Sequence, residues 1–211
     1  MTKTDNLDTE FGETKMADER FINGLDVHQL SGTIDGIKQE PELGKYTFRV
    51  KNEWINGAHC RTWIKDFSAS GKEDTSRTRT HVLEGDEPPV LLGADHGPNA
   101  TEALLHALGA CLNASFIYHA AAQGINIESL EFDVEGDLDL NGFLGTDETV
   151  PSNFQEIHVT CRVKSDAPHE KLDELWQYAQ KRSPVFNTVV NPIPVQVVLE
   201  TRKTPLFTHM H

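Results

Sequence analysis

The stretch from Gly97 to Gly124 constrains the fold most, because it is the longest apolar segment in the chain. Asn99 followed by Glu102 matches a capping box, and Gly124 can end the helix. Nearly every face of the predicted helix is apolar, which is typical of a buried helix rather than a surface one. Cys111 lies near its middle among small residues. We therefore expect the function of the protein to centre on this thiol.

The charge of the chain limits its partners. With 33 acidic and 19 basic residues its formal net charge is −14, so phosphates and anionic membranes would be repelled. We expect neither a nucleic-acid nor a membrane partner. The N-terminal residues lack the apolar core of a secretory signal. The segment 104–122 is long enough to cross a bilayer, but His106, Asn113, His119 and its many alanines favour a soluble core helix.

The other ionisable groups give little sign of a metal or a cofactor. Cys60, Cys111 and Cys161 are odd in number and widely spaced, so they predict neither a disulfide framework nor a zinc site. We expect a reducing cytoplasm, no metal and no cofactor. Cys161 is expected to be a filler of an alternating strand. Cys60 and His59 are adjacent, and adjacent strand residues face opposite sides, so they do not predict a catalytic dyad.

Three regions follow from the patterning. Residues 1–45 form an N-terminal extension that is polar and partly disordered up to about residue 19, with either a short helix or an arm that packs on a partner in 20–45. Residues 46–201 form the domain, and 202–211 a C-terminal tail. Strands are expected at 46–51, 60–67 and 77–83 before the central helix, with a hairpin turn at Asn56-Gly57. Strands at 125–140 and 154–163 follow it, the first with a register break near Ser129.

A second helix is expected over 169–182, capped by Ser165 or Asp166 and ended by Ser183-Pro184. A last strand is expected at 193–200. The order is three strands, buried helix, two strands, amphipathic helix and strand, which is typical of an α+β fold with a mostly antiparallel sheet. Because one small sheet cannot cover so apolar a helix, we also expect a homodimer.

The segment G-P-N-A-T-E-A-L-L-H-A-L-G-A-C-L resembles the signature helix of the OsmC/Ohr family, and the elements after it follow in the same order. The resemblance covers roughly residues 46–200. It implies an intertwined α+β homodimer with long central helices between sheets. It also implies an activity: thiol-dependent reduction of hydroperoxides, especially organic ones, as part of an oxidative stress response. One cysteine attacks the peroxide, and a second resolves the sulfenic acid.

Carried over to this sequence, the attacking cysteine is Cys111 and the resolving position is Ser183, in S-P instead of C-P. The acidic position of the family is Thr101. The turn of the first hairpin, E-W-I-N-G-A, has no arginine where the family has one. The arginines that the fold could bring to the thiol instead are Arg61, Arg77, Arg79 and Arg182.

Three hypotheses follow. In the first, the protein is a single-cysteine hydroperoxide reductase that uses Cys111 and depends on an external small or protein thiol as reductant. In the second, the scaffold is a dimeric small-molecule-binding module without catalysis, and Cys111 is a buried, inert thiol. In the third, Ser183 is the nucleophile of a hydrolase or transferase, although the sequence shows no paired base for it.

Overall fold

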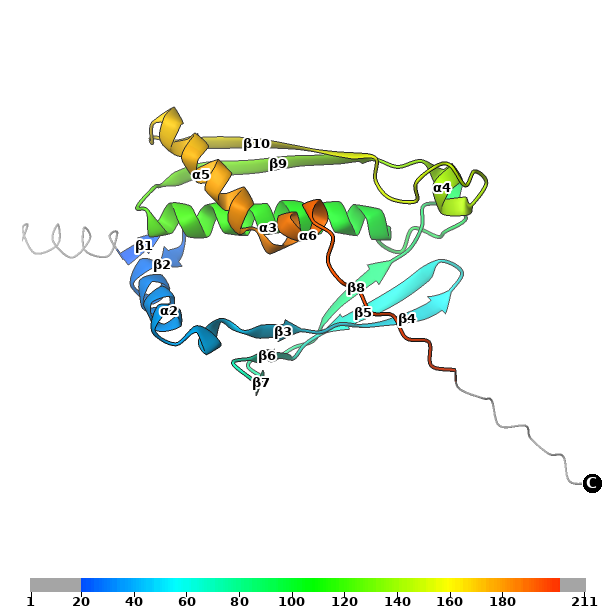
Figure 1. The fold of residues 1–211 in the computed structure, drawn as a ribbon, viewed down its shortest axis with the longest axis horizontal. Coiled ribbons are helices and arrows are strands. Elements are labelled where there is room, and N and C mark those ends of the chain that lie inside the picture. The colour runs from blue at the N-terminus through cyan, green and yellow to red at the C-terminus, as the bar shows by residue number, and fades with distance from the viewer. Residues whose placement is uncertain (1–19, 202–211) are drawn as a thin grey trace, which may run out of the picture.

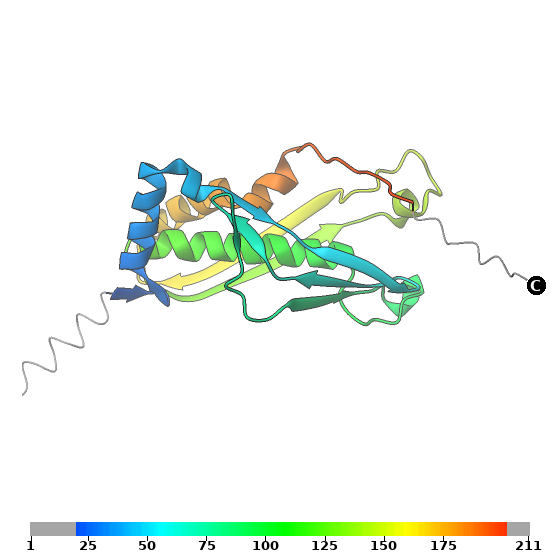
Figure 2. The same ribbon diagram turned by 90° about the horizontal axis from the view of Figure 1, so that it is seen from below.

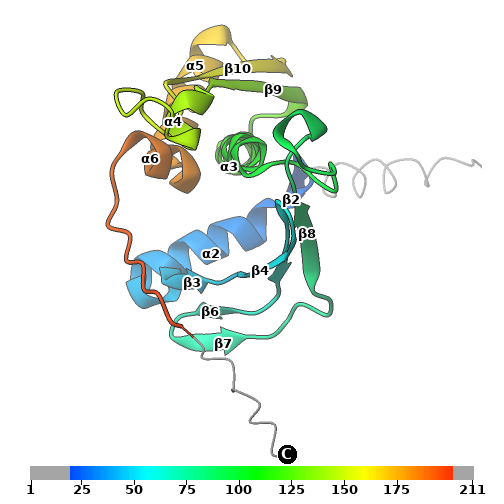
Figure 3. The same cartoon turned by 90° about the vertical axis from the view of Figure 1, so that its right-hand side faces the viewer.

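The computed structural model describes residues 20–201, and the predictions made for 1–19 and 202–211 lie outside this range. The α+β class is confirmed. Helix α3 lies along a two-stranded antiparallel ladder that α5 covers, while two small three-stranded sheets form a separate part of the molecule (Figure 1). Seen from the side, the β4–β5–β8 sheet lies apart from β9 and β10, and α3 belongs to the β9–β10 side (Figure 3).

Helix α3 (Ala100–Ala122) begins with the predicted capping box. The Glu102 amide donates to Asn99 Oδ1 at 2.8 Å, and the Asn99 amide donates to Glu102 Oε2 at 2.9 Å. Gly124 follows the last turn at a φ of +71°, a conformation that glycine adopts without strain. By length and composition α3 could cross a membrane. Here it packs against β9, α5 and α6.

Only one stripe of α3 is buried within the chain. Leu108, Leu112, Phe116 and Ala120 recur every four residues and are inaccessible, whereas Leu104 is 40% exposed. The expectation of a helix buried on nearly every face is therefore wrong for a single chain. One ladder covers one side of a helix, and the described chain supplies no second layer for the other side.

The main core lies between α3 and the elements that follow it. Strands β9 (Ile127–Asp137) and β10 (Glu156–Ser165) pair antiparallel, with a register irregularity opposite Ser129, as expected. Helix α5 (His169–Arg182) lies across them. Short α4 (Leu140–Leu144) occupies the connection between the strands. The core residues are Phe116, Ala120, Ile125, Leu175 and Ala179.

Two details after β10 differ from the prediction. The residue at the N-cap of α5 is Pro168, not Ser165 or Asp166. The Ser165 hydroxyl donates to the Asn126 carbonyl at 2.6 Å and accepts from the Ala167 amide at 3.2 Å, which lies before the first residue of α5. At Ser183-Pro184 the chain ends one helix and begins another, α6 (Pro184–Val190). The sequence prediction missed α6, because a proline that stops one helix is equally suited to the first turn of the next.

The first half of the domain forms two sheets instead of the expected single set of three strands. Its first expected strand divides at Arg49 and passes from one sheet to the other. One sheet has the order β3–β6–β7 and the other β4–β5–β8. The strands are β3 (Tyr46–Phe48), β4 (Lys51–Asn56), β5 (His59–Ile64), β6 (Phe67–Ala69), β7 (Lys72–Asp74) and β8 (His81–Gly85).

The N-terminal arm, defined as residues 20–44, consists of the hairpin β1 (Phe21–Ile22) and β2 (Leu25–Asp26), helix α2 (Val27–Gln39) and a 3-10 turn. The short helix that the sequence suggested within 20–45 is therefore present. Viewed from below, α2 lies across the C-terminal end of α3 (Figure 2).

The expected strand at 193–200 is wrong for a single chain. After α6 this segment runs outward from the layer of α3 (Figure 1), and it has no strand partner among residues 20–201. Its apolar side chains are largely in solvent, with Val197 89% and Leu199 86% exposed. A strand requires a neighbour to take up its backbone hydrogen bonds. The segment has the alternation of apolar and polar residues that a strand needs, but residues 20–201 provide no neighbouring strand for it.

Candidate functional site

Cys111 opens into a cleft on one side of α3. Its thiol is free and partly exposed, and the cleft measures about 340 Å³. Because residues three and four apart share a helix face, the positions that follow Cys111 at this spacing form one side of the cleft. These α3 residues are Cys111, Ala114, Ser115, Tyr118, His119 and Ala122.

Two other segments complete the cleft. Pro184, the first residue of α6, lies on one side, and Leu30 and Ile34 of α2 lie on another. The structure thus brings the Cys111 thiol and the residue after Ser183 to the same place. The arm residues were not expected there, because nothing in the sequence of 20–45 indicates a partner element.

Ser183 itself does not face the cleft openly. It is fully buried, and its hydroxyl accepts a hydrogen bond from the Phe186 amide at 3.3 Å, which caps α6. This burial argues against Ser183 as a nucleophile for an external substrate. Thr101 lies in the first turn of α3, next to the N-cap residue Asn99. Its hydroxyl donates to Asn99 Oδ1 at 2.7 Å, about 15 Å from Cys111 at the helical rise of 1.5 Å per residue.

His119 is the second ionisable group of the cleft. Burial lowers its pKa, and the positive charge of Arg182 lowers it further. The His119 ring meets the Tyr178 ring edge-on at 4.7 Å between centroids, and the Arg182 guanidinium lies 5.1 Å from the centre of the Tyr178 ring. His119 is therefore a neutral imidazole near pH 7, at the opposite end of the cleft from Cys111. Its spacing of eight residues from Cys111 was the signal that sequence reasoning missed.

Of the four candidate arginines, Arg182 is the one that reaches this site, through Tyr178. Arg61 donates to Glu84 at 2.7 Å within the β4–β5–β8 sheet. Arg77 donates to the Lys65 carbonyl at 2.9 Å. Arg79 lies in the connection between β7 and β8.

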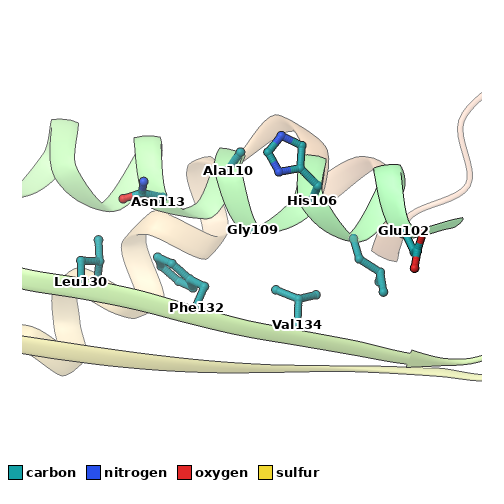
Figure 4. A pocket seen from close by; sticks show the side chains of 9 residues that line it. Glu102, His106, Gly109, Ala110, Asn113, Leu130, Phe132 and Val134 are labelled. Carbon is teal, nitrogen blue, oxygen red and sulfur yellow. The ribbon is translucent and has the colours of Figure 1, made fainter. Parts of the chain in front are cut away.

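A second cleft, of about 540 Å³, lies between α3 and β9 (Figure 4). It is a wide, shallow groove. Gly109 allows the helix to approach the strand, since a Cβ there would lie 3.3 Å from a Val134 methyl group. Apolar side chains form the floor and polar ones the rim. The floor residues are Leu130, Phe132 and Val134, and the rim residues are Glu102, His106 and Asn113.

The remaining cysteines lie away from these groups. Burial raises the pKa of the Cys161 thiol. Cys60 pairs with Gly85 in the ladder, whereas the neighbouring His59 Nε2 hydrogen bonds to Glu84 at 2.8 Å. The two side chains thus lie on opposite faces, as predicted. The ring of His59 stacks on that of His96 with centroids 4.3 Å apart, a contact that sequence reasoning missed.

One group of possible metal ligands is present in the described chain. Asp137, Glu156 and His158 each offer a ligand atom within 4.8 Å of the others, at an exposed end of the β9–β10 ladder. All three side chains are solvated, and such groups are common without an ion. Arg162 also pairs with Glu131 at 3.0 Å on the same ladder. The acidic residues of this ladder therefore form a solvated face.

The comparison with family models decides the family. The model described as OsmC-like protein matches residues 93–198, half of the chain. The chain belongs to the OsmC-like family. The matched segment of this OsmC-like protein runs from just before α3 to the segment after α6 and includes Cys111. The arm and the strands β3–β8 lie outside it.

The chain is also similar to solved structures, and the first of them supports this fold. The OsmC-like protein of Mycoplasma pneumoniae is 19% identical over 68% of this chain and 87% of its own, with a TM-score of 0.51. An organic hydroperoxide resistance protein OsmC of Legionella pneumophila is 17% identical over 68% and 88%, with a TM-score of 0.44. OhrB of Bacillus subtilis, an organic hydroperoxide resistance protein, is 19% identical over 67% and 90%, with a TM-score of 0.42. No curated protein matches the chain.

Proposed function

We propose that this OsmC-like protein is a thiol peroxidase of the oxidative stress response, in which Cys111 reduces an organic hydroperoxide. The supporting observation is the partly exposed Cys111 thiol at one end of a mainly apolar cleft. Such a cleft suits the carbon group of an organic peroxide better than it suits hydrogen peroxide, which has no apolar surface to bury. The family membership supports the same chemistry.

In the proposed reaction the Cys111 thiolate attacks one peroxide oxygen, so that an S–O bond forms and the O–O bond breaks. The departing alkoxide takes a proton and leaves as an alcohol, and the sulfur becomes a sulfenic acid. Because position 183 is a buried serine, the reductant is an external thiol. It condenses with the sulfenic acid to a mixed disulfide and releases water. A second thiol then frees Cys111 and leaves the oxidised reductant as a disulfide.

The test is intact-mass spectrometry of the folded protein after brief exposure to tert-butyl hydroperoxide, with a sulfenic-acid trap present. We expect one trap adduct per chain, mapped to Cys111 and absent in Cys111→Ser. Cys161→Ser is the matched control, because burial raises the pKa of that thiol, and it should keep the adduct. An adduct that forms only after unfolding would contradict the proposal.

The cleft between α3 and β9 supports a second candidate, a small-molecule-binding module without catalysis (Figure 4). Its apolar floor and polar rim are the features of sites that hold and orient small amphipathic ligands. Trp176 would report on binding, since its ring lies 5.8 Å from that of Phe132 in the floor.

The test of this second function is a titration with small amphipathic carboxylates and alcohols, followed by tryptophan fluorescence in the wild type and by thermal shift in the wild type and the variants. Ala110→Trp would fill the cleft, whereas Ala103→Trp places the same side chain on an exposed position of α3 that does not line it. Loss of the response only in Ala110→Trp supports the binding site. An equal response in both variants would exclude this cleft.

We further propose that the protein is a cytoplasmic homodimer. A large apolar surface is exposed on the single chain. It consists of the uncovered side of α3, the exposed apolar side chains of β4 and β8, and the segment 193–199. Trp54 alone is 72% exposed. Surfaces of this kind on soluble proteins mark association sites, and a second copy offers both an apolar face for α3 and a strand neighbour for 193–199. Sedimentation velocity would test this, and a single monomeric species would contradict it.

A further inference from the structure

The N-terminal arm lines one end of the Cys111 cleft. Along α3 the cleft runs from Cys111 to Ala122, about 16 Å at the helical rise of 1.5 Å per residue. Helix α2 crosses α3 at the Ala122 end (Figure 2). There Leu30 and Ile34, four residues apart and so on one face of α2, line the cleft opposite the thiol.

The arm is held in place by a specific contact with the segment after α3. The Asn23 side chain donates to the Ile125 carbonyl at 2.9 Å and accepts from the Ile127 amide at 2.8 Å. Asn23 and Gly24 both have positive φ, which forms the tight turn of the β1–β2 hairpin. The turn therefore presents the Asn23 side-chain amide to the backbone between Ile125 and Ile127, as a neighbouring strand would.

The same hairpin sets the start of α2. Asp26 is the N-cap residue and accepts from the amides of His28 and Gln29 at 3.1 and 3.0 Å. Arg20 pairs with the Asp26 carboxylate at 2.7 Å. Because the hairpin is fixed to Ile125 and Ile127, and α2 begins directly at the hairpin, the position of Leu30 and Ile34 relative to α3 is fixed as well.

We propose that the arm is the end wall of the thiol cleft and that Leu30 and Ile34 set the length of the molecule that can reach Cys111. The substrate class, hydroperoxides of unbranched carbon chains, is the part of this inference that rests on the proposed function. A chain whose peroxide lies at Cys111 extends along α3 past Ala114 and Tyr118 and ends against these two side chains. Both are apolar, so the wall accepts an alkyl end and rejects a charged one.

The test uses thiol reagents of graded length, which require access to Cys111 and no peroxide chemistry. The rates of Cys111 modification by N-ethylmaleimide and by a long N-alkylmaleimide are measured by mass spectrometry on the full chain. In Leu30→Ala and Ile34→Ala the long-to-short rate ratio should rise on the order of tenfold, the discrimination that about one methylene supplies in an apolar pocket. Ile34→Trp should lower the ratio.

Ile37→Ala is the matched control, since it removes the same side chain from α2 at a position that does not line the cleft. An unchanged ratio in both Ile34→Ala and Ile34→Trp would overturn the inference. Opposite shifts in these two variants cannot come from a general loss of stability. The rates for short and long alkyl hydroperoxides are then compared in the same proteins. If the maleimide ratios shift but no peroxide is reduced, the proposed function fails and the end wall stands.

Discussion

The His96 imidazole donates from Nδ1 to the Asp86 carboxylate at 2.7 Å, and the same carboxylate oxygen accepts the His96 amide at 3.3 Å. Asp86 is nearly inaccessible. It also accepts the amides of Glu87 and Ala94, at 2.8 and 3.1 Å. One carboxylate thus organises the loop that leads from β8 to α3.

These contacts hold the pKa of Asp86 far below its ordinary value, the His96 hydrogen bond most of all. Since the folded pKa is depressed, the stabilisation is present above about pH 3.9 and is lost as the pH falls from there toward the folded pKa. Asp86→Asn should therefore lower the unfolding temperature at pH 7, and its difference from wild type should shrink below about pH 4. Thermal unfolding followed by circular dichroism at pH 7, 5 and 3 measures this. A difference that is constant with pH would refute it.

Asn23→Gly keeps the positive φ of the turn and removes both side-chain hydrogen bonds. We expect a loss of about 1–2 kcal/mol in the free energy of unfolding, the net worth of two ordinary hydrogen bonds. The amides of α2 should also exchange faster with solvent. Asn23→Asp keeps the acceptor for the Ile127 amide and loses the donor to Ile125, so it should be intermediate. Urea titration and hydrogen exchange would show whether this order holds.

His119 gives the cleft a pH dependence near neutrality. Its folded pKa is depressed by burial and by Arg182, so below about pH 6.5 the unfolded chain binds a proton that the folded chain does not. Wild type should lose stability as the pH falls from about 6.5 toward the folded pKa, and His119→Gln should lose less over the same interval. Urea midpoints at pH 7.5, 6.0 and 5.0 provide the comparison. Parallel curves would mean that His119 titrates normally.

Val197→Glu should weaken the proposed dimer. Burying one such side chain contributes about 1.5–3 kcal/mol, so the dissociation constant should rise on the order of tenfold or more. Gln196→Glu is the control, because it adds the same charge on the other face of the extended segment. Light scattering after size-exclusion chromatography distinguishes them. If both variants associate as wild type does, the segment 193–199 lies outside the interface.

The local signals in the sequence were reliable wherever the interaction is itself local. Asn99 and Glu102 predicted the start of α3 to the residue, because a capping box needs nothing outside one helical turn. The turn at Asn56-Gly57 and the alternation of β9 and β10 were equally informative. Each of these features depends on residues within a few positions of one another.

Features that depend on distant segments were not predictable. Three such features depend on segments that are far apart in the chain. They are the pairing of β3 with β6 rather than β5, the placement of α2 on α3 by Asn23, and the absence of a partner for 193–200. Ser165 shows the same limit on a smaller scale. It is a good helix cap by residue type, but its hydroxyl bonds to the Asn126 carbonyl across the ladder and to the Ala167 amide, two residues before α5 begins.

For the candidate site, the sequence predicted Cys111, and the resemblance named Ser183-Pro184 and Arg182, but most of the residues that line the cleft were not predicted. His119 could have been found from its helical spacing. Leu30, Ile34 and the contact of Arg182 with Tyr178 could not, since they come from other elements. The cleft is formed by tertiary contacts, whereas the thiol is a property of one helix.

The distribution of the core has a consequence for biosynthesis. Among residues 20–201, every buried apolar side chain lies between Leu108 and Ala179. Strands β3–β8 therefore emerge from the ribosome before any part of this core exists. At roughly 5–20 residues per second, several seconds pass before α5 has been made, and during this time Trp54, Val82 and their neighbours remain in solvent. The half of the protein with the exposed apolar strands is thus synthesised first. Neighbouring nascent chains on one messenger RNA therefore expose these strand edges to each other before either chain has a hydrophobic core.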